Sequence, residues 1–223
     1  MTTIKIIGAS MSTFTRTIRM GLDYFKVPYE QVQVFPHSEE AKNYTPYGKI
    51  PILLIPGRED PMIETSVMRT YIDHVYGGKS TLPPLTPTDF EDQLTVNLWI
   101  GLVGDHIFKN LIFGIAKPRE FMEKRGETEE SIQARLKKPM ETAETIFKAL
   151  DKTLHSQPFI CGQRLTWADL FLYPCMADLF SLPEATIFKQ WSPKLWAWYQ
   201  HFEALDLAKN TYSGTVAQQR SLL

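Results

Sequence analysis

The stretch STFTRTIR, residues 12 to 19, crowds hydroxyl side chains and two arginines around one phenylalanine. It follows a short apolar run and precedes a helical pattern, so its hydroxyls lie in a loop that enters a helix. Ser and Thr at such a place accept hydrogen bonds from first-turn N–H groups and cap the helix. The same place lies at the positive end of the helix dipole, where a hydroxyl can also do chemistry. Ser10, Ser12 and Thr13 are the candidates, and both interpretations stay open.

Two further positions place polar groups at the start of a strand or a helix. Ile50-Pro51 opens a strand, a position where proline is normally unfavourable, and Lys49 stands directly before it. Glu64-Thr65 opens a helix, where an acid and a hydroxyl are already explained by capping and the helix dipole. The five histidines are scattered and no paired-cysteine motif occurs, so we expect no metal site.

The elements that must position these residues begin as strand, helix and strand. Residues 3–7 are β-branched apart from Lys5 and form a predicted strand. The apolar positions Phe14, Ile18, Leu22 and Phe25 mark one face of a helix that Pro28 ends. YEQVQVF then alternates as a second strand. Strands at residues 47–55 and 62–63 follow, and an amphipathic helix covers residues 67–75.

A segment rich in Gly, Pro, Ser and Thr, residues 77–89, separates this pattern from a purely helical one. Thr88 or Asp89 caps a helix that reaches about residue 116. A second helix covers about residues 129–154, with a kink expected at Pro139. Further helices start at Thr166 and at Ser192-Pro193. The sequence therefore predicts a small α/β domain joined to a larger all-helical one.

Composition and charge narrow the function classes. The 223 residues carry a formal net charge of -1, which gives no sign of a nucleic-acid partner. We find no apolar run of the roughly 18 residues that a membrane-spanning helix needs, and no secretory leader. Two cysteines do not make a disulfide framework. We therefore expect a soluble protein of a reducing compartment, the cytoplasm.

Four motifs in order resemble the cytosolic glutathione transferase family. They are SxFxRxIR (12–19), YGKIPIL (47–53), IETSVMRTYI (63–72) and CGQRLTWADLFL (161–172). The pattern is most similar to the serine-type classes, with features like those of the plant tau and phi classes. The resemblance covers nearly the whole chain. It implies a thioredoxin-like domain (βαβ-ββα) at residues 1–77, a linker at 78–89 and an all-helical bundle domain at 90–223.

The resemblance also implies roles for the polar residues. The family's catalytic serine falls on Ser12, whose hydroxyl would stabilise the glutathione thiolate, with Ser10 as the alternative. Lys49 would meet the glycyl carboxylate of glutathione. Ile50 would pair through its backbone with the cysteinyl part, exposed by a cis bond to Pro51. At the other end, Glu64 and Thr65 would hold the γ-glutamyl ammonium and carboxylate.

By the same resemblance, the electrophile's pocket lies between the domains. Its expected walls are Met11, Phe14, Phe35, Trp99, Val103 and His106, although an aromatic at helical spacing is also a common core residue. Arg16 either braces the two domains or lies on a solvated helix face. LTWAD, residues 165–169, is a capping signature with a structural role.

The function implied is conjugation of glutathione, as co-substrate, to small hydrophobic electrophiles in detoxification. An isomerase, reductase or lyase that uses glutathione at the same site is one alternative. A non-catalytic ligand-binding or regulatory member of the fold is another. The family resemblance also implies a homodimer, without a nucleic-acid or membrane partner.

Overall fold

The N-terminal part of the molecule is a three-stranded sheet with helices on both faces. The structure, a computed structural model, describes residues 3–222. The sheet has the order β2-β1-β3, with β1 (Ile4–Ile7) parallel to β2 (Tyr29–Val32) and antiparallel to β3 (Ile52–Leu54). Helix α1 (Thr13–Tyr24) connects β1 to β2. Helix α3 (Thr65–Ile72) follows β3 and continues into a short π-helix, η1 (Asp73–Gly77).

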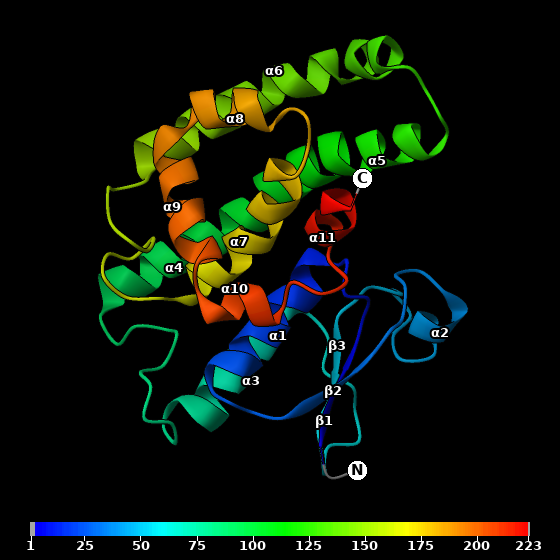
Figure 1. Cartoon of the computed structure of the whole chain (residues 1–223). Coiled ribbons are helices and arrows are strands. Elements are labelled where there is room, and N and C mark those ends of the chain that lie inside the picture. Colours follow the sequence, from blue (N-terminus) through cyan, green and yellow to red (C-terminus); the bar gives the residue numbers. More distant parts are fainter. Residues whose placement is uncertain (1–2, 223) are drawn as a thin grey trace.

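The two faces of this sheet belong to different apolar clusters, as alternation along a strand requires. Ile6 and Leu53 point into the main core, which α1 and α3 share with the C-terminal helices. Ile7 and Ile52 pack on the other face against Ala41 of the short helix α2 (Glu39–Lys42). Figure 1 shows α1 and α3 on the side of the sheet that faces the helical part of the molecule.

Residues 78–89 carry no helix or strand, and helices follow to the end of the described chain. They are α4 (Phe90–Leu102), η2 (Val103–Ala116), α5 (Lys117–Lys124), α6 (Glu129–Thr153), α7 (Trp167–Phe180), α8 (Ala185–Trp191), α9 (Pro193–Glu203), α10 (Asp206–Asn210) and α11 (Val216–Ser221). Helix α7 is buried along nearly its whole length and is the centre around which the others pack. The prediction of an α/β unit followed by an all-helical one is confirmed.

Helices α4, η2 and α5 form one continuous rod from Phe90 to Lys124. Its middle, η2, is a π-helix of 14 residues, a rare form in which hydrogen bonds run from residue i to i+5. By length and composition this rod is apolar enough to cross a membrane, with a mean hydropathy of 1.3 over an 18-residue window. The expectation that no segment of this kind exists was wrong. Its side chains Val96, Trp99, Val103 and Ile107 lie in the common core.

Several element boundaries differ from those predicted. The expected fourth strand at residues 62–63 is a single bridge, in which the backbone groups of Leu53 and Met62 exchange two hydrogen bonds of 2.9 Å. The third strand is shorter than predicted because residues 47–51 form a turn and a cis peptide bond, Ile50-Pro51. Pro139 lies inside α6, which is one continuous element.

The LTWAD signature is the capping box of α7, formed by Thr166 and Asp169. The Asp169 carboxylate accepts from the backbone N–H of Thr166 at 2.9 Å and of Ile160 at 2.9 Å, and from the Trp198 indole at 3.0 Å. One buried carboxylate thus satisfies donors from three separate segments. Burial raises the pKa of Asp169 to about 6, although these hydrogen bonds favour the charged form.

Asp178 is the contrasting case on the same helix. Its side chain is 3% exposed, and among the described residues its Oδ2 has no hydrogen-bond partner. Burial raises the pKa of Asp178 from 3.8 to about 7, although the positive charges of Lys117 and Arg16 act to lower it. The folded chain therefore keeps a proton that the unfolded chain releases between those two values. The free energy of unfolding must then fall as the pH rises through this window.

We predict that Asp178→Asn removes this fall, because an amide does not titrate. At pH 8 the variant should unfold with a free energy higher than wild type by on the order of 1–3 kcal/mol, the cost of an unsatisfied buried polar group. Near pH 4 the two proteins should be equal. Denaturant titrations at several pH values measure both. Asp206→Asn, at a side chain 90% exposed, is the control without effect. A variant less stable than wild type at pH 8 contradicts the prediction.

Candidate functional site

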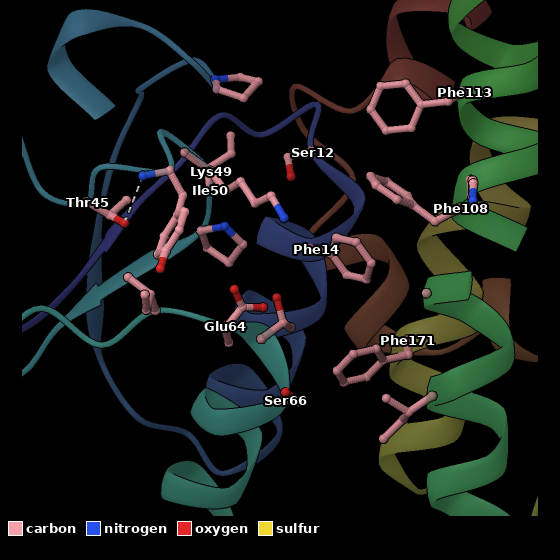
Figure 2. A pocket seen from close by; sticks show the side chains of 18 of the residues that line it. Ser12, Phe14, Thr45, Lys49, Ile50, Glu64, Ser66, Phe108, Phe113 and Phe171 are labelled. Carbon is pink, nitrogen blue, oxygen red and sulfur yellow. Dashed lines mark hydrogen bonds between the residues drawn. The ribbon is translucent and has the colours of Figure 1, made fainter. Parts of the chain in front are cut away.

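A cavity of about 770 Å³ opens between the N-terminal unit and the helices η2 and α7. Figure 2 shows polar side chains on the side of the sheet and phenylalanines on the side of the helices, with Ser12 and Phe14 between them. The residues that line it are Ser12, Phe14, Pro36, His37, Thr45, Tyr47, Lys49, Ile50, Pro51, Ile63, Glu64, Thr65, Ser66, Ile100, Gly104, Asp105, Phe108, Lys109, Phe113 and Phe171. The cavity thus has two chemically different halves that meet at the start of α1.

Ser12 is the N-cap of α1, and its Oγ accepts a hydrogen bond of 3.3 Å from the backbone N–H of Thr15. A hydroxyl has one donor hydrogen besides its acceptor lone pairs, so this cap leaves the donor available. Ser12 also lines the cavity, whereas Ser10 does not. The Ser10 hydroxyl instead accepts from the side-chain amides of Gln31 at 3.1 Å and Gln33 at 2.8 Å. Capping and chemistry are therefore compatible at Ser12.

Arg16 sets the direction of α1. Its side chain is 1% exposed, and its guanidinium donates to Thr211 Oγ1 at 3.2 Å, Tyr173 Oη at 3.2 Å and the carbonyl of Ala208 at 3.0 Å. It also lies 4.7 Å from the centre of the Tyr173 ring, within cation–π range. Of the two interpretations left open by the sequence, the brace between α1 and the C-terminal helices is the correct one.

The loop that carries Lys49 is held against the loop after β2. Gly48 adopts a left-handed conformation with φ of 60°, and its carbonyl accepts from the backbone N–H of His37 at 2.6 Å. The exposed Lys49 follows, and then Ile50 with its cis bond to Pro51. All three residues line the cavity. The arrangement brings a cation and a backbone edge to the polar half.

Glu64 begins α3 with a left-handed backbone, φ 66°, which is uncommon for a residue with a side chain. Its side chain makes no capping hydrogen bond to the helix, so the carboxylate is not used as a cap. Thr65 and Ser66 follow in the first turn and line the cavity as well. A helix N-terminus presents N–H groups that bind anions. The polar half therefore holds a carboxylate beside an anion-binding turn, with Lys49 as a cation.

The aromatic half depends on the π-helix. In η2, hydrogen bonds from i to i+5 stack residues five apart along the same face, unlike in an α-helix. Phe108 and Phe113 are five apart, and their ring centroids lie 5.0 Å from each other. Phe108 also lies 4.6 Å from Phe14, which in turn lies 6.1 Å from Phe171. Four phenylalanines from three elements thus form a continuous apolar wall (Figure 2).

The structure brings together Ser12, Lys49, Ile50, Pro51, Glu64 and Thr65, the six polar and backbone positions expected from sequence. The expected apolar walls are not brought together in this way, because only Phe14 of the six expected residues lines the cavity. Trp99 and Val103 are core residues. Phe35 and His106 are exposed and Met11 is half-buried, and none of these three lines the cavity.

The residues that the sequence prediction missed are mainly Phe108, Phe113 and Phe171. Counting at α-helical spacing from Trp99 selects the face of the rod that packs on α7. The spacing of five residues between Phe108 and Phe113 was the signal that the sequence offered. It places the two side chains on one face only if the helix is a π-helix.

Neither cysteine competes for this chemistry. Cys175 is fully buried and Cys161 half-buried, and neither lines the cavity. Burial raises the pKa of the Cys161 thiol to about 11, so it is protonated at neutral pH. Within residues 3–222 no three His, Cys, Asp or Glu side chains are grouped as a metal would require.

Comparison with known proteins gives one family for both parts of the chain. Residues 6–80 match the model of the glutathione S-transferase N-terminal domain, and residues 119–209 match that of its C-terminal domain. Glutathione S-transferase U17 of Arabidopsis thaliana is 28% identical over 207 residues, which cover 89% of this chain and 85% of that protein.

Solved structures show the same fold. Glutathione transferase F7 from Populus trichocarpa superposes with a TM-score of 0.79 at 20% identity, covering 95% of this chain and 98% of that one. A glutathione S-transferase from Methylobacillus flagellatus, solved with glutathione bound, gives a TM-score of 0.74 at 22% identity, covering 94% and 98%.

Proposed function

This chain belongs to the cytosolic glutathione transferase family, and we propose that Ser12 activates the glutathione thiol for attack on small hydrophobic electrophiles. The observation that supports this most is the position of the Ser12 hydroxyl. It lies where the polar half of the cavity meets the aromatic half, at the N-terminus of α1, with its donor hydrogen left over from capping. We also place the protein in the cytoplasm, in a detoxifying role.

The energetic requirement is modest. A free thiol has a pKa of about 8.5, and each unit of depression needs about 1.36 kcal/mol of preference for the thiolate. A charge-assisted hydrogen bond from Ser12 supplies roughly 1.5–3 kcal/mol. The dipole and N–H groups of the α1 N-terminus add to it. Together these effects are large enough to make the bound thiol a thiolate at neutral pH.

The polar half matches the charges of glutathione. In the proposed complex, Glu64 pairs with the γ-glutamyl ammonium. Thr65, at the start of α3, binds the adjacent carboxylate through its hydroxyl and N–H. Lys49 meets the glycyl carboxylate, and the backbone of Ile50 pairs with the cysteinyl residue. This places the sulfur beside Ser12 and directs it toward the phenylalanine wall, where the electrophile binds.

The same proposal includes a homodimer. Val67 of α3 and Phe90, Leu94 and Leu98 of α4 are 50%, 66%, 46% and 54% exposed. The three residues of α4 share one face at i, i+4 and i+8. Helix α3 lies beside it, since Arg69 Nη2 donates to Asn97 Oδ1 at 2.6 Å. Exposed apolar residues grouped on one helix face are typical of an interface, and we propose that a second copy covers them.

Charge removal at either end of the polar half should weaken glutathione binding without disturbing the fold. Both Glu64 and Lys49 are exposed, so Glu64→Gln and Lys49→Met should keep the melting temperature of wild type. Each loses an ion pair with the ligand, and we expect the dissociation constant to rise about 10- to 100-fold, an order-of-magnitude figure for a charged hydrogen bond. Titration calorimetry measures it. Failure of the wild type to bind glutathione at millimolar concentration refutes the proposed site.

The two functions of Ser12 can be separated by substitution. Ser12→Ala loses both cap and donor, so the helix should lose about 1 kcal/mol and conjugation at neutral pH should slow about 10- to 100-fold. Ser12→Asp keeps a good cap but has no hydroxyl to donate, so it should recover stability and remain slow. Steady-state kinetics with glutathione and an aryl halide, alongside thermal melts, gives both readouts. An active Ser12→Asp variant would show that Ser12 is only a cap.

Light scattering tests the homodimer. The wild type should give about twice the monomer mass of 25.7 kDa. A charge in the middle of the apolar face, Leu94→Glu, should shift the protein toward monomer because a buried unpaired charge is unfavourable. Phe121→Glu, at an exposed phenylalanine of α5, is the matched control that should stay dimeric. A wild type at the monomer mass overturns this part of the proposal.

A further inference from the structure

Two glutamine side chains hold the loop that leads from β1 into α1. Gln31 lies in β2, and Gln33 comes directly after that strand. The Gln31 amide donates to the carbonyl of Gly8 at 2.8 Å and to Ser10 Oγ at 3.1 Å. The Gln33 amide donates to Ser10 Oγ at 2.8 Å and accepts from the backbone N–H of Ser10 at 3.0 Å. We call Gln31, Gln33 and Ser10 the amide clamp.

Ser10 is a central residue of the turn that ends at Ser12. The backbone N–H of Ser12 donates to the carbonyl of Ala9 at 3.0 Å, and this bond closes a four-residue turn with Ser10 and Met11 in its middle. In so short a turn, the direction in which the last residue leaves depends on where the two central residues lie. A hold on Ser10 is therefore a hold on Ser12.

The C-terminal segment between α10 and α11 packs against the same residue. Gly214 has a φ of 79°, and a Cβ added to it would lie only 2.7 Å from the Cβ of Ser10. Figure 1 shows this segment passing beside the start of α1. Ser10 thus lies between the two glutamines and Gly214, with little room to move.

Ser12 depends on this support because its own bond to the helix is long. The Thr15 N–H reaches Ser12 Oγ at 3.3 Å, above the usual upper limit of about 3.2 Å for such a bond. Arg16 fixes α1 itself, whereas Ser12 is the N-cap, with extended backbone before the first helical residue. Its hydroxyl is therefore held by the helix on one side and by the turn on the other.

The amide clamp does not touch the space where glutathione would bind. None of its three residues lines the cavity, and none of their side chains carries a charge. An effect of the clamp on a bound sulfur must therefore pass through the turn and Ser12. Hydrogen bonds weaken steeply when their angle departs from linear, so a small rotation of Ser12 would reduce its preference for a thiolate.

We propose that the amide clamp positions the Ser12 hydroxyl toward the sulfur of glutathione. This inference rests on the proposed function of Ser12, and it makes Ser10 a positioning residue rather than an alternative donor. A donor that is held in place before the substrate binds does not have to be ordered during the reaction. The two amides of β2 supply that order from outside the cavity.

The ultraviolet absorbance of the bound thiolate, titrated against pH, tests the proposal in the full chain. Gln33→Leu removes both hydrogen bonds of an exposed amide, so the melting temperature and the affinity for glutathione should stay close to wild type. The pKa of the bound thiol should rise by about 0.5–1 unit. At a pH below that pKa, conjugation should slow about 3- to 10-fold, because the thiolate fraction falls.

Two further single variants locate the effect. Ser10→Ala removes the oxygen that both amides share and should shift the pKa of the thiol in the same direction. Gln133→Leu is the matched control, because its amide also makes an exposed hydrogen bond, of 3.0 Å to Glu129 within α6. It should leave the thiol unchanged.

Combining Gln33→Leu with Ser12→Ala decides whether the clamp acts through Ser12. If it does, Gln33→Leu has no further effect on the thiol once the hydroxyl is gone, and the two shifts are strongly non-additive. Additive shifts overturn the inference, as does an unchanged pKa in Gln33→Leu beside a raised one in Ser12→Ala. In both cases the proposed function stands. An unchanged pKa in Ser12→Ala itself rejects the proposed function and this inference together.

Discussion

The Arg16 guanidinium, buried where α1 meets α7 and α10, makes the interaction on which the geometry of the cavity at Ser12 depends. A charge taken out of water is costly unless it is hydrogen-bonded, and Arg16 ties α1 to Thr211, Tyr173 and Ala208 through Nε and Nη2, while Nη1 has no partner among the described residues. One turn earlier on the same helix is Ser12. Any rotation of α1 that moved Ser12 would also break the bonds of Arg16. The position of the hydroxyl is therefore set by the packing between the two parts of the molecule.

The cavity that Ser12 faces is built from two different kinds of backbone irregularity. On the sheet side, the cis bond at Ile50-Pro51 and the left-handed Glu64 turn polar groups toward one point. On the helical side, the π-helix η2 turns Phe108 and Phe113 to the same face. Neither half would form on ideal secondary structure. Strained or rare backbone is expected at functional sites, where surrounding packing maintains it.

The sequence predicted what is encoded locally. The cap at Thr166 and the proline at the first position of α9 are chemical signals that short windows contain. For α1 and α4 the sequence narrowed the cap to Ser10, Ser12 or Thr13 and to Thr88 or Asp89, and the structure selects Ser12 and Asp89. The polar half of the site could also be placed, because the motifs that resemble the family include its residues. The helices α8 and α10 were missed, since elements this short depend on tertiary packing rather than on periodicity.

The apolar half could not be predicted for a different reason. The family resemblance placed Trp99 and Val103 in the wall, and helical spacing alone does not distinguish a pocket residue from a core residue. Trp99 lies in α4 and Val103 at the start of η2, and both face the core, whereas the i to i+5 repeat further along η2 places Phe108 and Phe113 on the cavity side. The burial of Arg16 was equally hidden, since its partners lie more than 150 residues away in the chain.

The central claim is that the Ser12 hydroxyl lowers the pKa of the thiol of bound glutathione. The most direct test is the ultraviolet absorbance of the thiolate in the binary complex, titrated against pH for wild type and Ser12→Ala. The account predicts a wild-type pKa below the solution value of about 8.5 and a rise of about one to two units in the variant. Superimposable titration curves for the two proteins would contradict it and leave Ser12 as the cap of α1 alone.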